Sequence, residues 1–68
     1  LFTPAQKNAL LVESRGRCQT QGCDAPPAWL QADHITPHPH HGPTTLTNGQ
    51  TLCQPDNKRK GDRQTPDQ

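Results

Sequence analysis

The chain has few of the residues that build a large apolar core. Only 26% of its 68 residues are hydrophobic, the aromatic residues are one phenylalanine and one tryptophan, and tyrosine and methionine are missing. Eight prolines and five glycines favour irregular backbone. A chain this short buries a modest fraction of its surface and is marginal without further stabilisation. The composition therefore predicts one small domain that depends on a metal or on a parent protein.

Long hydrophobic runs are also missing. No apolar stretch is long enough for a transmembrane helix, and no signal-peptide pattern is present. We therefore expect no contact with a membrane. Because the chain starts at Leu1 and not at methionine, we expect residues 1–68 to be a single domain that is excised from, or part of, a larger protein.

An excess of positive charge is missing as well. The net charge is only +1 with neutral histidines, so bulk charge does not point to nucleic acid. The distribution is more informative, because four cations gather near the C-terminus: Lys58, Arg59, Lys60 and Arg63. Clustered cations are typical of phosphate contacts. The alternative is a solvated charged face.

Cysteine is scarce, and the three thiols of Cys18, Cys23 and Cys53 cannot all pair within one chain. Their spacing suits metal ligands in a reducing compartment better than a disulfide framework. We therefore expect a cytoplasmic protein.

Cap signals predict a helix at the start of the chain. Thr3 and Gln6 have the spacing of a capping box, and Pro4 suits the first helical position. Gly16 is a natural stop, so we expect the helix to cover residues 1–16.

Short elements follow this helix. We expect strands over residues 28–35 and 49–52, a helix over residues 55–60 and a frayed tail over residues 62–68. Trp29 is expected to pack under the two strands as the main aromatic residue of the core.

An acidic residue, a histidine and two amides stand out in the second half: Asp33, His34, Asn48 and Asn57. A carboxylate and an amide oxygen are ligands that Mg²⁺ prefers. Neutral His34 can take a proton from water. The other asparagine can fix the geometry around His34, although Asn48-Gly49 is also an ordinary turn signal. The set suits hydrolysis assisted by a hard cation.

The pattern around these residues resembles the HNH endonuclease family. The matching residues are Asp33-His34-Ile35 and Pro37, then Gly42, Thr44, Leu46 and Asn48, then Leu52-Cys53, Asn57, Lys58 and Lys60. Upstream, the zinc-knuckle branch of the family is similar at Arg17-Cys18, Gly22-Cys23 and Pro26-Pro27-Ala28-Trp29. The resemblance implies a small α+β fold, the ββα-metal finger. A short antiparallel hairpin and a helix would form the core over residues 17–61, preceded by the N-terminal helix.

The resemblance also implies roles for the four polar residues. His34 would be the general base, and Asp33 and Asn57 would hold a catalytic Mg²⁺ or Mn²⁺. Asn48 would tie the loop to the backbone near His34. The alternatives are a surface strand carboxylate for Asp33 and a helix-cap amide for Asn57.

The cysteines resemble three ligands of the family's structural zinc. The position of the usual fourth ligand, a cysteine or histidine, is occupied by Asp56. Aspartate can bind Zn²⁺ through oxygen, so Asp56 is the favoured fourth ligand. The alternatives are a ligand from His38, His40 or His41, loss of the zinc, and Asp56 as a helix N-cap.

The expected function is therefore a metal-dependent nuclease that hydrolyses phosphodiester bonds in double-stranded DNA, in a bacterium or phage. It would leave a 5′-phosphate and a 3′-hydroxyl, as a monomeric domain or as a dimer through a parent protein. The cations expected to contact nucleic acid are Lys58, Arg59, Lys60 and Arg63. The alternative function is a catalytically silent zinc-knuckle module that only binds nucleic acid, which would have no need for Asp33, His34 and Asn57.

Overall fold

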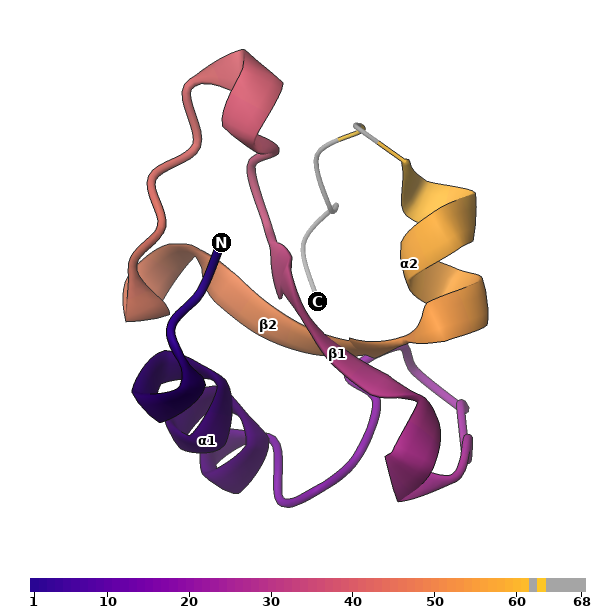
Figure 1. Cartoon of the computed structure of the whole chain (residues 1–68). Helices are drawn as coiled ribbons and strands as arrows, with labels where there is room; N and C mark the ends of the chain where they lie inside the picture. The colour runs from indigo at the N-terminus through magenta and orange to yellow at the C-terminus, as the bar shows by residue number, and fades with distance from the viewer. Residues whose placement is uncertain (62, 64–68) are drawn as a thin grey trace.

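Figure 1 shows the computed structural model of the chain, which describes residues 1–61 and residue 63. Helix α1 (Pro4–Glu13) precedes an antiparallel pair of strands, β1 (Leu30–His34) and β2 (Gly49–Cys53), and helix α2 (Gln54–Lys60) follows β2 directly. The small α+β fold with a hairpin followed by a helix is confirmed. The tail predicted over residues 62–68 lies outside the described residues, except for Arg63. Within the described part, the helices are too short and polar to cross a bilayer.

The side chains of Asp33 and His34 lie on opposite faces of the hairpin. β1 and β2 pair in continuous register, with Asp33 opposite Gln50. Successive side chains of a strand alternate, so Asp33 and His34 point to different faces. Lys60 of α2 reaches Asp33, and Phe2, next to α1, stacks on the His34 ring. The two helices therefore lie on opposite sides of the hairpin and meet the end of β1 from both faces (Figure 1).

Helix α1 begins where the cap signals predict. The Gln6 backbone N–H donates to Thr3 Oγ1 at 3.1 Å, and the Thr3 N–H donates to Gln6 Oε1 at 2.9 Å, which completes the capping box. The helix ends at Glu13, before the predicted Gly16. Arg15, with a φ of +59°, takes the left-handed conformation directly after the Ser14 cap and donates its N–H to the Val12 carbonyl at 3.0 Å. The Gly16 N–H donates to the Leu11 carbonyl at 2.9 Å, which completes a Schellman motif and ends the helix before Gly16.

A glycine lets α1 approach the hairpin closely. A Cβ atom at Gly49 would lie 2.8 Å from Leu10 Cδ1 and 3.2 Å from Phe2 Cζ. Both neighbours are buried core residues. Any larger residue at position 49 would therefore push the helix away from β2, and Phe2 away from His34.

Two predictions at the start of β1 are wrong. Pro27–Trp29 form a 3₁₀ turn, so the strand begins at Leu30 and not at residue 28. Trp29 is 51% exposed and is not the core aromatic; Phe2, 5% exposed, takes that place. The cause is Pro26 and Pro27. They favour the turn, in which the Trp29 N–H donates to the Pro26 carbonyl at 2.9 Å and not to the sheet.

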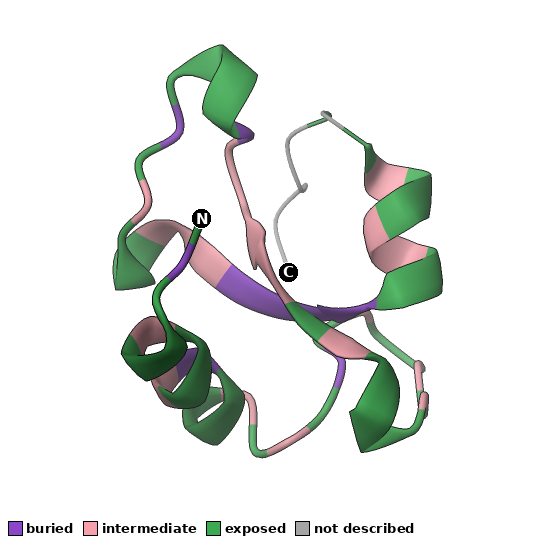
Figure 2. Ribbon diagram, in the orientation of Figure 1, coloured by how far each residue is buried: buried purple, intermediate pink, exposed green. Residues whose placement is uncertain are grey.

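The buried residues gather in β2, which forms the centre of the molecule (Figure 2). Leu52 and Cys53 pack with Cys18 there, and Cys23, Ala25 and Leu30 pack around them. Half of this cluster is thiol, as expected from the shortage of aliphatic residues. The apolar core is thin, and the cysteines are its main component.

Candidate active site

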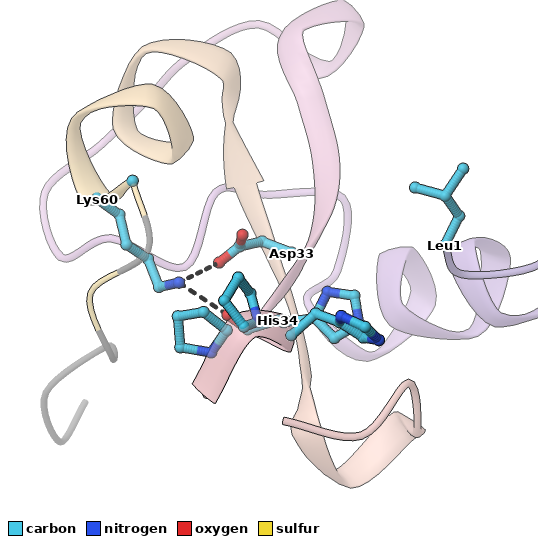
Figure 3. Close-up of a pocket in the computed structure, with 8 residues that line it drawn as sticks. Leu1, Asp33, His34 and Lys60 are labelled. Carbon is cyan, nitrogen blue, oxygen red and sulfur yellow. Dashed lines mark hydrogen bonds and ion pairs between the residues drawn. The ribbon is translucent and has the colours of Figure 1, made fainter. Parts of the chain in front are cut away.

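Asp33 and His34 end strand β1 beside an open cavity. The cavity has a volume of about 580 Å³, and its lining includes Asp33, His34, His38 and Lys60. Figure 3 shows Lys60 reaching from α2 toward the end of β1, where dashed lines join its ammonium to Asp33 and to the backbone of His34. The structure therefore brings the predicted carboxylate and the predicted base to one solvent-accessible place.

The Asp33 carboxylate has two fixed partners. Gln50 donates its side-chain N–H to Asp33 Oδ2 at 2.9 Å, and the Lys60 ammonium lies 3.2 Å from the same oxygen. Lys60 Nζ also donates to the His34 carbonyl oxygen at 2.8 Å. Both ionic side chains are largely buried, with 10% of Lys60 and 12% of Asp33 exposed. Lys60 thus faces the site, unlike the outward direction expected of a simple phosphate contact.

The His34 ring is held on three sides. Its Nε2 lies 2.9 Å from Thr44 Oγ1, within a hydrogen bond. Phe2 lies against the ring with 4.5 Å between centroids, and His38 meets it edge-on at 6.4 Å. Burial lowers the pKa of His34 below its ordinary 6.5. Asp33 opposes this shift, while His38 and Lys60 add to it. The ring is therefore neutral at pH 7, which is the form that accepts a proton.

Asn48 joins the two ends of the long loop that connects the strands. It ends a 3₁₀ turn, η3 (Leu46–Asn48), directly before β2. Its Oδ1 accepts the Thr36 N–H at 2.9 Å, and its Nδ2 donates to the carbonyls of Thr36 at 3.1 Å and Pro43 at 2.8 Å. Its own carbonyl accepts the Ile35 N–H at 2.9 Å. These bonds fix the backbone that directly follows His34.

Asn57 lies on α2, but it does not touch Asp33 or line the cavity. Its Nδ2 donates to Gln31 Oε1 at 2.9 Å. Gln31 and Asp33 share one face of β1, so Asn57 lies beside the carboxylate on the same face. Among the described residues its side-chain oxygen accepts no hydrogen bond. The donors near this face are oxygens, and an ammonium already lies against one of them, so their chemistry fits a hard cation.

A second cluster lies at the other end of the hairpin. The sulfurs of Cys18, Cys23 and Cys53 and a carboxylate oxygen of Asp56 all lie within 4.8 Å of one another. The Cys23 and Cys53 sulfurs are 3.8 Å apart, and Asp56 Oδ2 lies 3.3 Å from Cys18 Sγ and 3.1 Å from Cys53 Sγ. In tetrahedral zinc with Zn–S bonds of about 2.3 Å, two sulfurs are about 3.8 Å apart. The four atoms therefore have the spacing of a zinc site.

The charges of this cluster also fit a cation. Burial, followed by the hydrogen bond to Asp56, raises the pKa of the Cys53 thiol to about 12. Thiol hydrogen bonds from Cys53 and Cys18 lower the pKa of Asp56 to about 2. The Asp56 carboxylate thus stays ionised, while it helps to keep the Cys53 thiol protonated. A bound divalent cation would instead lower the pKa of the cysteine thiols, because a coordinated thiol loses its proton.

Asp56 is the acidic member of the cluster and not the helix cap. Cys53 is the N-cap residue of α2, and it makes no side-chain cap hydrogen bond. In the part of the chain that the structure describes, no histidine joins the cluster. His38 lies at the cavity, and His40 and His41 are exposed on the loop. Asp56 is therefore the fourth ligand that the structure offers.

Comparison with known proteins agrees with this geometry. A family model described as HNH endonuclease matches residues 17–63, which include both clusters. The chain belongs to the HNH endonuclease family. Members of this family use divalent metals, and the cluster of three cysteines and one aspartate is compatible with zinc.

Curated relatives of this HNH domain come from mycobacteria. The uncharacterized proteins Rv1148c and Rv1945 of Mycobacterium tuberculosis and Mb1179c of Mycobacterium bovis are each 36% identical to it over 58 residues, or 85% of the chain. The matched segment is only 13% of the length of each relative. No solved structure matches the chain.

The four basic residues near the C-terminus of the HNH domain divide into two kinds. Lys60 is turned into the site, as described above. The others are exposed at the end of α2: Lys58, Arg59 and Arg63. Arg59 also pairs with Asp56 at 3.2 Å, and the Arg63 guanidinium donates to the carbonyls of Lys60, at 3.1 Å, and Arg59. Three cations therefore remain on the surface of α2 and of the residues that follow it.

The structure adds contacts to the predicted site residues that the sequence did not predict. Gln50 holds Asp33, Gln31 holds Asn57, and Thr44 holds His34. The register of the hairpin was a usable signal for the first, since Asp33 pairs with Gln50 directly across the sheet. Thr44 is among the residues that carry the family resemblance, but its contact with His34 was not predicted, because only the folded loop brings the two side chains together.

Proposed function

We propose that this HNH domain is a metal-dependent endonuclease that hydrolyses phosphodiester bonds in DNA, with His34 as the general base. The observation that carries the proposal is the meeting of a neutral, oriented histidine and a paired carboxylate at one open cavity. Membership of the HNH family supports the same chemistry. A module that only bound nucleic acid would not require this arrangement.

Thr44 gives His34 the tautomer that the reaction requires. When Nε2 carries the ring proton and donates to Thr44 Oγ1, 2.9 Å away, Nδ1 keeps a free lone pair. That nitrogen then takes the proton from an attacking water as the bond to phosphorus forms. Phe2 prevents the ring from tilting, since it packs against one face.

Asp33 and Asn57 are proposed to hold the cation. A divalent cation bound there would stabilise the negative charge that develops on the phosphate and on the leaving 3′ oxygen. Gln50 keeps the Asp33 carboxylate in place, and Gln31 engages the Asn57 amino group so that the amide oxygen stays available. Oxygen donors favour Mg²⁺ or Mn²⁺ over a softer metal.

The knuckle and the surface cations complete the proposal. Cys18, Cys23, Cys53 and Asp56 would hold one structural Zn²⁺, which fixes α2 against the hairpin. The exposed cations Lys58, Arg59 and Arg63 would contact the DNA backbone and give affinity without sequence preference.

Plasmid cleavage tests this function. We expect the zinc-loaded domain to nick or cut plasmid DNA with Mg²⁺ or Mn²⁺, to stop in excess EDTA, and to lose activity in His34→Ala. Binding of the plasmid without cleavage under all metal conditions would favour the silent binding module.

A further inference from the structure

The Lys60 ammonium lies against Asp33, one of the two proposed cation ligands. The ammonium lies 3.2 Å from the Asp33 carboxylate and 2.8 Å from the His34 carbonyl oxygen, and only 10% of the side chain is exposed (Figure 3). A carboxylate and a backbone carbonyl are hard oxygen donors, which both an ammonium and a divalent cation prefer. Two positive charges cannot share one carboxylate oxygen without strong repulsion.

Lys60 is also placed where it can be drawn away. It lies at the end of α2 and lines the cavity that opens beside His34. A lysine has a flexible stem of four carbons, so its ammonium can move to a new partner while the helix stays in place. A DNA phosphate in the cavity offers such a partner, because it is an anion with several oxygens.

We propose that Lys60 is a tethered counter-ion that blocks the divalent cation at Asp33 until a DNA phosphate releases it. This inference rests on the proposed function, since it assumes that Asp33 binds the catalytic cation. In the free protein, Lys60 neutralises Asp33 and weakens cation binding. In the complex, the phosphate takes the ammonium and the carboxylate becomes available. DNA and cation binding therefore strengthen each other, and by linkage each raises the affinity of the other by the same factor.

The consequence is a nuclease site that assembles on its substrate. The cation would load mainly when DNA is present, so the free protein would hold little of the metal that its chemistry needs. Gln50 matters here as well, because its hydrogen bond at 2.9 Å keeps Asp33 in position while the positive partner is exchanged.

Binding of Mn²⁺, followed by electron paramagnetic resonance, tests this inference without a measurement of activity. The protein carries His34→Ala so that DNA is not cut, and it holds an equimolar amount of Zn²⁺ so that the thiols are filled. Lys60→Gln removes the charge but keeps a donor for the His34 carbonyl. Lys60→Arg keeps the charge, and Lys58→Gln is the matched control that removes a surface charge from the same helix.

We expect Lys60→Gln to bind Mn²⁺ about 5- to 150-fold more tightly than the parent when DNA is absent, the usual range of coupling between sites. Lys58→Gln and Lys60→Arg should stay close to the parent. A short DNA duplex should raise the Mn²⁺ affinity of the parent more than that of Lys60→Gln, because the variant has no ammonium to release.

Equal Mn²⁺ affinity for Lys60→Gln and Lys58→Gln would overturn the inference, as would an equal effect of DNA on the parent and on Lys60→Gln. Failure of the proposed function gives a different result, namely no Mn²⁺ bound by any of these proteins with or without DNA. Zinc content and circular dichroism confirm that each variant is folded. If Lys60→Gln does not fold, the parent alone serves as the second test, because a Mn²⁺ affinity that DNA does not raise would also overturn the inference.

Discussion

Replacement of Asn48 by alanine should destabilise the domain through its loop. The substitution removes three side-chain hydrogen bonds, with lengths of 2.8, 2.9 and 3.1 Å, to the backbone of Thr36 and Pro43. At about 0.5–1.5 kcal/mol for each bond, the loss is about 1.5–4.5 kcal/mol. A native chain has about 0.05–0.15 kcal/mol of stability per residue, so a domain of this length has roughly 3–10 kcal/mol in all. The variant should therefore lose a large part of its stability.

The measurement is urea unfolding of the zinc-loaded protein, followed by circular dichroism. Thr47→Ala is the matched control, because Thr47 is an exposed neighbour whose side chain, among the residues that the structure describes, bonds only to Thr45, at 3.2 Å. We expect the control to cost less than about 0.5 kcal/mol. If Asn48→Ala cost no more than Thr47→Ala, Asn48 would be an ordinary turn residue and the loop would have another source of order.

Three further predictions follow from the two clusters. Removal of zinc with a chelator should unfold the domain, because the thiols form much of the core and metal binding supplies folding energy. An unchanged circular dichroism spectrum of the zinc-free protein would contradict the zinc site. Neutralisation of Lys58 should weaken binding to unrelated DNA sequences alike and lower the salt slope by about one unit, which binding measured over a series of salt concentrations checks. As the pH is lowered from 7, the single-turnover cleavage rate should stay constant until the pH is below 6.5 and should then fall. The reason is that the pKa of His34 is lowered from 6.5 and only the neutral ring accepts a proton. A midpoint of the rate–pH curve above 6.5 would contradict the assignment of His34 as the base.

Local signals predicted the parts of the fold whose causes are local. The capping box at Thr3 and Gln6 formed as its spacing required, and β2 starts at Gly49 as expected. The error at Trp29 has a different origin. An aromatic residue beside aliphatic ones suggests a strand, but two preceding prolines impose a turn and leave the indole exposed. Phe2 is the aromatic residue of the core instead, and its position depends on a contact with His34, which is distant in the sequence.

In the candidate site, too, the sequence predicted the residue types but not the contacts between distant segments. The type and order of Asp33, His34, Asn48 and Asn57 predicted a site for metal-assisted hydrolysis, through their resemblance to the HNH family. The partners that orient these residues come from other segments and were not visible. Lys60 is the clearest case, since a lysine in a basic run suggests a surface cation, whereas the helix turns this one onto Asp33. Such placement depends on which side of α2 meets the hairpin.

The central claim is that His34 acts on the water while Asp33 and Asn57 act on the cation. The most direct test is single-turnover DNA cleavage measured against Mn²⁺ concentration for His34→Ala and Asn57→Ala. Loss of a general base typically costs about 10²–10⁴-fold in rate. We predict a loss of this size in His34→Ala that no Mn²⁺ concentration restores. In Asn57→Ala we predict a weaker affinity for Mn²⁺, so that excess metal restores part of the activity. Rescue of His34→Ala by metal, with no rescue of Asn57→Ala, would contradict the account and make His34 a metal ligand.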